Sequence, residues 1–472
     1  MHLLMIGGSD AGISAALRAR ELDPSADVTV VLADAYPNFS ICGIPYYVSG
    51  EVTHWRNLAH RTAADLEAAG LTLRLDTVAR RIDVPGRKLL ITNSDGSEEL
   101  IGYDKLVIGT GAVPVRPPIS GLDRLGPGDG VHQLHSMDDT FAVMRTIEKR
   151  QPTSAVIVGA GYIGLEMAEA LTVRGLDVTQ IEQLPEVLPT VDPELGALVH
   201  AELASHGVKV LTGTTVRHIG PAGPGAAARL RVDATADGAT ISELADMVLV
   251  VTGVRPDSEL AASAGAALGF KATIAVDRGM RTSLPDVFAA GDCVITQHRL
   301  LGETYLPLGT TAHKQGRIAG ENSLGGCREF AGSLGTQVVK VFDQVAARTG
   351  LRDHEAAPAG FDPVTVENVA DDHKAYYPGS NSITIRVTGD RVTRRLLGMQ
   401  LFGHRHAEVA KRIDIAATAI FHAMTVDVIS DLDLSYTPPL GSPWEAIQMA
   451  AQAWDRSLSA PAAKEGQCSK PT

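Results

Sequence analysis

The sequence predicts an α/β fold with two similar parallel-sheet domains and a separate C-terminal α+β domain. A unit of strand, glycine-rich turn, helix and strand occurs twice, and this order requires a right-handed parallel connection. From residue 334 the pattern changes to alternating strands and amphipathic helices. The length of 472 residues also exceeds what one hydrophobic core supports, roughly 250–300 residues. Because glycine-rich turns ahead of helices bind dinucleotides, the first two domains are predicted to be Rossmann-like dinucleotide-binding domains.

The first unit starts at the beginning of the chain. A short apolar strand, Leu3–Ile6, leads into a glycine-rich turn and a helical pattern. Glycine lets the chain reverse tightly and lets the backbone approach a pyrophosphate, and the helix N-terminus then offers free N–H groups to the phosphates. The residues expected to bind the dinucleotide here are Gly7, Gly8, Ala11 and Gly12.

The second unit fills all three glycine positions of the dinucleotide-binding pattern. Strand 155–158 is followed by Gly159, Gly161 and Gly164, then by a helix and a strand that ends at Glu182. A carboxylate at this position accepts hydrogen bonds from a ribose 2′-hydroxyl and repels a 2′-phosphate. The sequence therefore favours NADH over NADPH.

Three further strands repeat the theme of a buried strand that leads into a glycine turn. These strands are followed by Thr110 and Gly111, by Gly253, and by Gly291 and Asp292. The third of them ends in an acidic residue, which distinguishes it from the other two.

Composition excludes several classes of function. Aromatic residues make up 4% of the chain and the formal net charge is −13, which disfavours nucleic acid and anionic membranes as partners. The cysteines are too few and too scattered for a disulfide scaffold or a zinc ribbon, and they fit a reducing compartment. No metal site is predicted. No targeting segment or bilayer-spanning stretch is visible, so we expect a cytoplasmic protein.

Several segments together resemble the flavoprotein disulfide reductases that bind two dinucleotides, over residues 1–453. Within that superfamily the chain is similar to the single-cysteine branch, which contains coenzyme A disulfide reductases, persulfide reductases, NADH oxidases and NADH peroxidases. The segments that carry the resemblance are Asn38–Tyr47, Gly109–Gly111, Gly159–Glu166, Gly291–Asp292, Leu308–Ala312, Tyr376–Gly379 and Leu434–Pro439.

The resemblance implies FAD on the first domain, NAD(P)H on the second and a homodimer formed by the third. On this basis, the FAD-binding domain is expected to comprise residues 1–115 and 256–330, the NAD(P)H-binding domain 116–255, the dimerisation domain 331–455 and a flexible tail 456–472.

The resemblance also implies roles for residues near the cofactors. Asp292 would bind the ribityl chain of FAD. Asp34 is expected to hold the FAD ribose, with water or backbone as the alternative, because Leu32 occupies the place of the family's acid. Tyr162 would cover the flavin until the nicotinamide displaces it, and Glu166 would lie near the flavin–nicotinamide stack. Thr110, Gly111, Gly253, Thr311 and Ala312 complete the expected cofactor contacts.

Cys42 is the predicted reaction centre. The reactive form of cysteine is the thiolate, and a helix with Pro45 in its first turn is expected to lower the pKa of Cys42 through its dipole. Tyr47 stands where the dithiol enzymes of the superfamily carry a second cysteine. The oxidised form of Cys42 is therefore expected to be a mixed disulfide, a persulfide or a sulfenic acid. The alternative is a buried structural cysteine.

Two carboxylates depart from the family pattern. Glu21 aligns with an arginine that pairs with a coenzyme A phosphate in the family. Asp10 occupies the place of a histidine that steadies the cysteine sulfenate in oxidases and peroxidases of the branch. An anion there does not play the same part, which weakens the interpretation as a peroxidase.

Three tyrosines and a tail cysteine complete the candidate residues. Tyr376, Tyr377 and Tyr436 match family tyrosines that reach across the dimer toward the partner's cysteine, where a phenol can donate a proton to a leaving thiolate. Packing at the dimer interface is the alternative. Cys468 is either a shuttle for electrons or an inert thiol in the tail.

The function predicted from these residues is the NADH-dependent reduction of a small thiol-derived disulfide or persulfide through FAD and Cys42. One alternative is an NADH oxidase or peroxidase in which Cys42 cycles through a sulfenic acid. Another is a flavoprotein redox sensor with little turnover.

Overall fold

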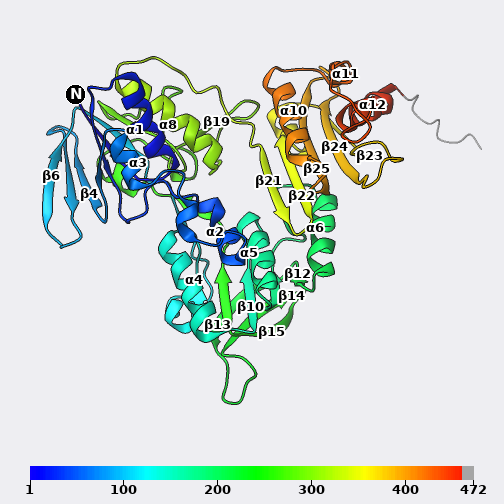
Figure 1. Cartoon of the computed structure of the whole chain (residues 1–472), viewed down its shortest axis with the longest axis horizontal. Helices are drawn as coiled ribbons and strands as arrows, with labels where there is room; N and C mark the ends of the chain where they lie inside the picture. Colours follow the sequence, from blue (N-terminus) through cyan, green and yellow to red (C-terminus); the bar gives the residue numbers. More distant parts are fainter. Residues whose placement is uncertain (460–472) are drawn as a thin grey trace, which may run out of the picture. The chain divides into compact units, whose positions relative to one another are not determined.

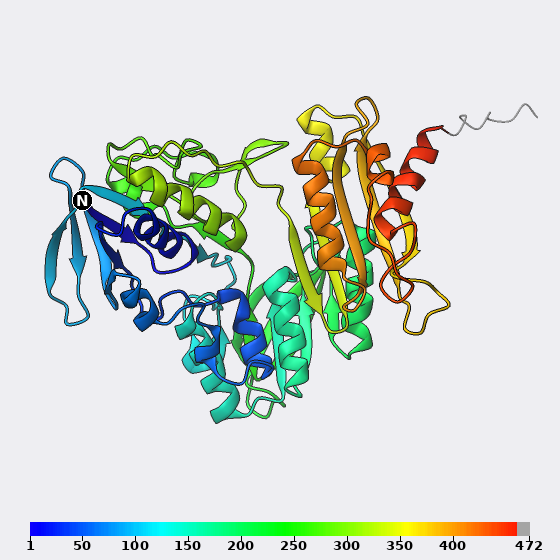
Figure 2. The same ribbon diagram turned by 45° about the horizontal axis from the view of Figure 1, so that its top comes forward.

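The structure, a computed structural model, describes residues 1–459 of the chain. It divides into two compact units, of which the first is Met1–Ser333 and the second begins at Leu334. Each unit is a mixed α/β structure with its own sheets (Figures 1 and 2).

The first unit contains a parallel sheet built from both ends of its sequence. Its strand order is β18-β7-β1-β2-β3, and each neighbouring pair is parallel. The strands are apolar because the sheet is buried on both faces, as parallel sheets are. Their bounds are β1 His2–Ile6, β2 Asp27–Val31, β3 Leu71–Arg74, β7 Lys105–Ile108 and β18 Val287–Ala289.

Helices α1 (Asp10–Leu22) and α8 (Gly309–Ser323) lie side by side against this sheet (Figure 1). Two glycines of α8 allow the close approach. A Cβ on Gly316 would lie 2.3 Å from the carbonyl oxygen of Ala11, and one on Gly320 would lie 2.2 Å from that of Ala15. The backbones of the two helices are therefore in direct contact.

A second parallel sheet in the same unit has the order β12-β11-β10-β16-β9. Its strands are β9 Val131–His132, β10 Ser154–Val158, β11 Asp177–Ile181, β12 Lys209–Leu211 and β16 Met247–Val250. The accompanying helices are α4 Met137–Arg150, α5 Tyr162–Val173 and α6 Pro193–Ser205, and the antiparallel strands β13 Thr215–Pro221, β14 Leu230–Ala236 and β15 Ala239–Ala245 form a separate small sheet.

The chain passes from the first sheet to the second and back through two neighbouring strands. These are β8 (Ala112–Pro114) and β17 (Val254–Pro256), which pair antiparallel. The crossing is held further by Thr110, whose hydroxyl donates to the carbonyl oxygen of Asp257 at 2.5 Å. The two repeats of strand, glycine turn, helix and strand are therefore β1-α1-β2 and β10-α5-β11, as the sequence predicts.

The second unit is built on an antiparallel sheet with the order β21-β22-β25-β24-β23. Helix α10 packs against β22 and β25, and helix α12 packs against β23 and β24 (Figure 2). The side chain of Trp454 on α12 is fully buried, and its indole N–H donates to the carbonyl oxygen of Val364 at 2.8 Å. The bounds are β21 Gln337–Val341, β22 Gln344–Gly350, β23 Pro363–Asp371, β24 Ser382–Asp390, β25 Leu396–His404, α10 Val409–Phe421, α11 Val426–Ser430 and α12 Ala446–Ser459.

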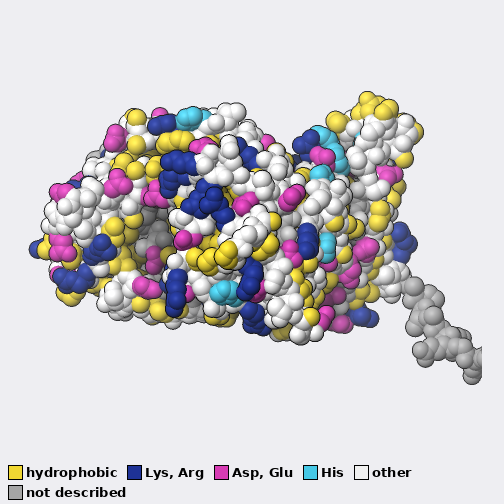
Figure 3. Space-filling model, turned by 90° about the horizontal axis from the view of Figure 1, so that it is seen from below, with side chains coloured by type: hydrophobic (Ala, Val, Ile, Leu, Met, Phe, Trp, Pro, Cys, Tyr) yellow, Lys and Arg dark blue, Asp and Glu magenta, His cyan; other side chains and the backbone are white. Residues whose placement is uncertain are grey.

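Acidic and basic side chains are interspersed on the face that Figure 3 shows. Among the described residues, no helix combines the length and the apolar character that a bilayer crossing requires.

Replacing Gly316 with alanine is expected to destabilise the first unit, because the added Cβ overlaps the backbone of α1. Overpacking of this kind costs about 1–3 kcal/mol. The melting temperature should fall for Gly316→Ala and stay close to the parent value for the control Gly128→Ala, whose Cβ would meet nothing within 4 Å. Equal melting temperatures for both variants would contradict the tight α1–α8 contact.

Candidate functional site

Each glycine turn packs its backbone against the end of the next strand in its sheet. Gly7 has a φ of 107°, and a Cβ there would lie 2.0 Å from the carbonyl oxygen of Gly109. Gly159 has a φ of 108°, and its Cβ would lie 2.6 Å from the carbonyl oxygen of Val251. The two turns thus have the same geometry, which a side chain at either position would prevent.

The third glycine of each turn allows its helix to start close to the strand. A Cβ on Gly12 would lie 2.0 Å from the carbonyl oxygen of Gly7, and one on Gly164 would lie 2.1 Å from that of Gly159. In contrast, Cβ atoms on Gly111, Gly161 and Gly253 would meet nothing within 4 Å. These three glycines therefore border open space beside the turns.

The structure brings Ala11 together with the residues that follow β18. A Cβ on Gly291 would lie 2.8 Å from the Cβ of Ala11 and 3.6 Å from that of Ala312. The N–H of Gly291 donates to Oε1 of Gln315 at 3.0 Å. Two of the predicted cofactor residues, Ala11 and Ala312, therefore meet beside the first glycine turn, and Asp292 and Thr311 are the chain neighbours of Gly291 and Ala312.

Three buried polar atoms near this turn have no hydrogen-bond partner within the described chain. They are Oδ1 of Asn38, the hydroxyl of Tyr305 and Nε2 of Gln315. The N–H of Asn38 donates to the carbonyl oxygen of Gly8 at 2.7 Å. Burial raises the pKa of the Tyr305 phenol, and the nearby carboxylate of Asp292 adds to the rise. Buried polar groups need partners. An elongated polar ligand such as FAD would satisfy them, so the residues present fit this cofactor.

Sequence reasoning did not single out Gln315 and Tyr305. Gln315 follows Thr311 by four residues and so lies on the same face of α8, a spacing that could have indicated it. No pattern in the sequence identified Tyr305.

Cys42 lies in a single turn of 3-10 helix, Ile41–Gly43, directly ahead of α2 (Ile44–Ser49). Its thiol is free and accessible. The surrounding protein nevertheless desolvates the thiol, and this raises its pKa, with further contributions from the carboxylates of Glu166, Asp10 and Asp292. The prediction that the pKa of Cys42 is lowered is therefore wrong, because the surrounding protein raises it. Desolvation and the nearby carboxylates outweigh the dipole of a helix of only six residues.

The two carboxylates nearest the first turn are themselves perturbed. Burial and the proximity of Asp10 raise the pKa of Asp292 to about 6. Burial also raises the pKa of Asp10, and His313 and His60 oppose that rise. Nε2 of His313 lies 3.3 Å from Oδ1 of Asp10. The sequence did not indicate that a histidine from α8 reaches the position of Asp10.

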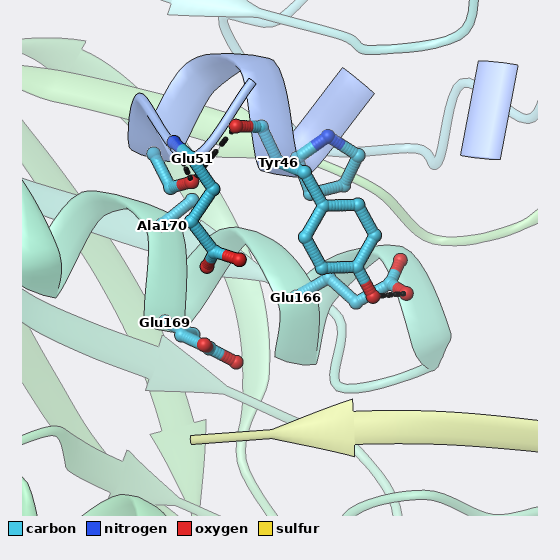
Figure 4. Close-up of a pocket in the computed structure, with 7 residues that line it drawn as sticks. Tyr46, Glu51, Glu166, Glu169 and Ala170 are labelled. Atoms are coloured by element: carbon cyan, nitrogen blue, oxygen red, sulfur yellow. Dashed lines mark hydrogen bonds between the residues drawn. The ribbon is translucent and has the colours of Figure 1, made fainter. Parts of the chain in front are cut away.

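A small pocket lies between α2, the helix after Cys42, and α5, the helix that follows the second glycine turn (Figure 4). The hydroxyl of Tyr46 donates to Oε1 of Glu166 at 3.3 Å, and burial together with Glu166 raises the pKa of this phenol. Nε of Arg174 donates to the carbonyl oxygen of Val48 at 2.6 Å. The pocket is lined by Pro45, Tyr46, Ser49, Glu51, Glu166, Glu169 and Ala170. Hydrogen bonds therefore connect the segment that carries Cys42 to α5 and to the residue that ends it.

Glu182 lies directly after β11 and is held against the second turn. Its Oε2 accepts the N–H of Ala160 at 2.7 Å, and its Oε1 accepts the N–H of Leu184 at 2.9 Å. Tyr162 starts α5, and its hydroxyl accepts a hydrogen bond from Thr190 at 3.0 Å.

Asp34 is placed differently from Glu182. The first residue after β2 is Leu32, and a Cβ on Gly8 would lie 2.5 Å from Cδ1 of that leucine. Oδ1 of Asp34 accepts the N–H of Tyr36 at 2.9 Å, and burial raises the pKa of Asp34. The two turns therefore differ at the position where the sequence predicts an acid that holds a ribose.

The three candidate tyrosines lie in the second unit and are exposed, with relative accessibilities of 73% for Tyr376, 43% for Tyr377 and 46% for Tyr436. A side-chain hydrogen bond joins Tyr376 to Tyr436. Cys468 lies outside the described residues. Within residues 1–459, no group of three or more His, Cys, Asp or Glu side chains has an arrangement that could hold a metal ion.

Known proteins share this architecture over nearly the whole chain. The model of the pyridine nucleotide-disulphide oxidoreductase family matches residues 1–316, and the dimerisation-domain model of the same family matches residues 336–447. An NADH oxidase of Methanocaldococcus jannaschii is 32% identical over 97% of this chain and 100% of its own length. A CoA-dependent NAD(P)H sulfur oxidoreductase of Pyrococcus furiosus is 34% identical over 95% of this chain and 98% of its own length.

A solved structure, the NAD-dependent persulfide reductase from A. fulgidus, superposes with a TM-score of 0.91 and 38% identity over 97% of this chain and 84% of its own. Three observations support the same family: the two glycine turns, the buried polar atoms beside the first turn, and the matches to the family models. The chain belongs to the pyridine nucleotide-disulphide oxidoreductase family and is an FAD-dependent NAD(P)H oxidoreductase.

Proposed function

We propose that this enzyme uses NADH to reduce a small thiol-derived disulfide or persulfide, and that Cys42 is its reactive thiol. The observation that carries the proposal is the position of Cys42. It is a free, accessible thiol on a segment that is anchored to the first turn through Asn38 and Gly8 and to α5 through Tyr46 and Glu166. The names of two relatives, a CoA-dependent sulfur oxidoreductase and a persulfide reductase, support this class of substrate.

Each part of the site has a proposed task. The turns at Gly7–Gly12 and Gly159–Gly164 hold the phosphates of FAD and NADH, and Glu182 accepts the ribose hydroxyl of NADH. Bound FAD supplies the two-electron transfer between nicotinamide and thiol. We propose that residues 1–115 and 256–330 bind FAD, that residues 116–255 bind NADH, and that residues 331–455 form the dimer.

One thiol is enough for the proposed reduction. The Cys42 thiolate attacks one sulfur of the substrate disulfide, forms a mixed disulfide with that half, and releases the other half as a thiolate that takes up a proton. Two electrons that originate from NADH then cleave the mixed disulfide. This restores the Cys42 thiolate and releases the second half as a thiol, with one more proton consumed. Among the described cysteines, Cys293 is buried at 0% accessibility and cannot serve as a second reactive thiol.

The enzyme is proposed to work as a homodimer. The match to a dimerisation-domain model supports this, as do the exposed Tyr376, Tyr377 and Tyr436 in that region. In the dimer, one of these phenols would donate the proton to the leaving thiolate at the partner's site.

Oxygen is the second candidate acceptor, because a full-length relative at 32% identity is an NADH oxidase. In that case Cys42 would cycle through a sulfenic acid. NADH consumption with oxygen alone, compared with consumption under nitrogen in the presence of coenzyme A disulfide or a persulfide, separates the two reactions.

Cys42→Ala is expected to abolish the long-wavelength absorbance that arises when a thiolate contacts oxidised flavin, and to lower disulfide reduction by on the order of a hundredfold or more. The control is Cys327→Ala, which removes another exposed thiol. The spectrum after titration with NADH and the rate with coenzyme A disulfide are the measurements. Survival of the band in Cys42→Ala would refute the assignment of Cys42.

Glu182→Gln is expected to lower kcat/KM for NADH by roughly 10–100-fold, since hydrogen bonds to a charged group contribute about 1.5–3 kcal/mol. The NADPH rate should fall less, because the variant no longer repels a 2′-phosphate. Glu186→Gln is the matched control, because it makes the same substitution at a nearby carboxylate that pairs with His200 at 3.0 Å. An unchanged ratio of NADH to NADPH rates would contradict the proposed role of Glu182.

A further inference from the structure

Asp10 lies where two helices begin. It is the first residue of α1, and a Cβ on Gly309, the first residue of α8, would lie 2.8 Å from its Oδ2. The N-termini of helices carry partial positive charge, which favours a carboxylate at this position. A carboxylate so placed is at the same time close enough to raise the pKa values of Cys42 and Asp292.

His313 reaches Asp10 from the neighbouring helix. Its Nε2 lies 3.3 Å from Oδ1 of Asp10, and its Nδ1 lies 2.8 Å from Oγ of Ser14. Ser14 is one helical turn after Asp10, so one imidazole from α8 contacts two side chains of α1 that share a face. Each ring nitrogen of His313 therefore faces a polar side chain of α1. The contact therefore fixes the orientation of the ring.

A second histidine completes the cluster. The ring of His60 lies 6.4 Å from that of His313 in an edge-to-face arrangement. Its backbone N–H donates to the carbonyl oxygen of Asn38 at 2.9 Å, which places His60 against the segment that precedes Cys42. Both histidines act to lower the pKa of Asp10, so both lie within electrostatic range of the same carboxylate.

The other charged groups around this cluster are acidic or already paired. Glu166 from α5 and Asp292 from the end of β18 face Cys42 and add negative charge. Farther along the α1–α8 contact, Arg18 pairs with Glu21 and Glu321, and Arg317 pairs with Glu21. Lys314 donates to the carbonyl oxygen of Thr310 on its own helix. His313 and His60 are therefore the basic side chains that lie next to Asp10 in this cluster.

We infer that Asp10 and His313 are positioning residues that set the charge beside Cys42, with Asp10 opposing the thiolate and His313, supported by His60, offsetting Asp10. The inference rests on the proposed role of Cys42 as the reactive thiol. It also bears on the carboxylate at position 10, where oxidases and peroxidases of the branch carry a histidine. In this chain the imidazole next to the first turn belongs to His313 on α8.

The test is the pH dependence of Cys42 alkylation in the purified holoenzyme. Iodoacetamide reacts with the thiolate, so the pH midpoint of its rate reports the pKa of the thiol. Modification is measured by mass spectrometry of the Cys42 peptide, which separates it from Cys327. The variants are Asp10→Asn and His313→Asn. The control is His200→Asn, which removes the histidine of another carboxylate–histidine pair.

Opposite shifts are the expected result. Asp10→Asn removes an anion, so the midpoint falls and the rate at pH 7.5 rises about threefold, which corresponds to roughly half a pKa unit. His313→Asn leaves Asp10 without its partner, so the midpoint rises and the rate falls by about the same factor. His200→Asn matches the parent. The thiolate–flavin absorbance of the reduced enzyme should follow the same two directions.

Shifts in the same direction for Asp10→Asn and His313→Asn would overturn the inference, because mere loosening of the site exposes Cys42 in both. Unchanged midpoints in both variants would also overturn it. Flavin absorbance after gel filtration verifies that each variant is folded, and Asp10→Ser replaces Asp10→Asn if the amide variant loses its flavin. The alkylation uses neither NADH nor an acceptor, so its failure would leave the proposed reaction standing.

Discussion

The contact of backbone with backbone at the glycine turns is the constraint on which the site depends. At Gly7 and Gly12 the chain is so close to Gly109 and to itself that a Cβ would lie 2.0 Å from a carbonyl oxygen. At Gly316 and Gly320, on α8, a Cβ would lie 2.3 and 2.2 Å from carbonyl oxygens of α1. These contacts place the N-termini of two helices, the end of β18 and the Cys42 segment around one turn. Function requires that arrangement, because a pyrophosphate binds to free N–H groups at a helix start.

This tight packing also brings several carboxylates close to Cys42. Asp10, Asp292 and Glu166 come from three parts of the sequence, and all three raise the pKa of Cys42. A reactive thiol in such surroundings needs compensation, because the thiolate is both desolvated and repelled. Within the described chain, the side chains of His313 and His60 lie next to Asp10 and oppose the rise of its pKa. If Cys42 is the reactive thiol that we propose, its reactivity depends on residues that act on it through their charge and not through a hydrogen bond.

Local patterns predicted the fold well because they depend on neighbours in sequence. The two units of strand, turn, helix and strand, the strand that ends directly before Glu182 and the change of pattern near residue 334 are all present. Contacts between segments that are distant in sequence were harder to predict. The partner of Asp10 is 303 positions away, and nothing in the sequence around His313 indicates that its ring faces the first turn. The predicted direction of the pKa shift at Cys42 was wrong for the same reason. The burial that raises this pKa, and the carboxylates that add to the rise, come from segments far from Cys42 in sequence.

The fate of the Cys42 sulfur tests the account most directly. The enzyme is reduced with NADH, freed of excess NADH and mixed with coenzyme A disulfide under nitrogen, and its peptides are then mapped by mass spectrometry without a reducing agent. We predict one coenzyme A moiety in disulfide linkage on the peptide that contains Cys42, removed by a further addition of NADH. An adduct on another cysteine with Cys42 unmodified, or an adduct on Cys42 that NADH does not release, would contradict a reaction through this thiol.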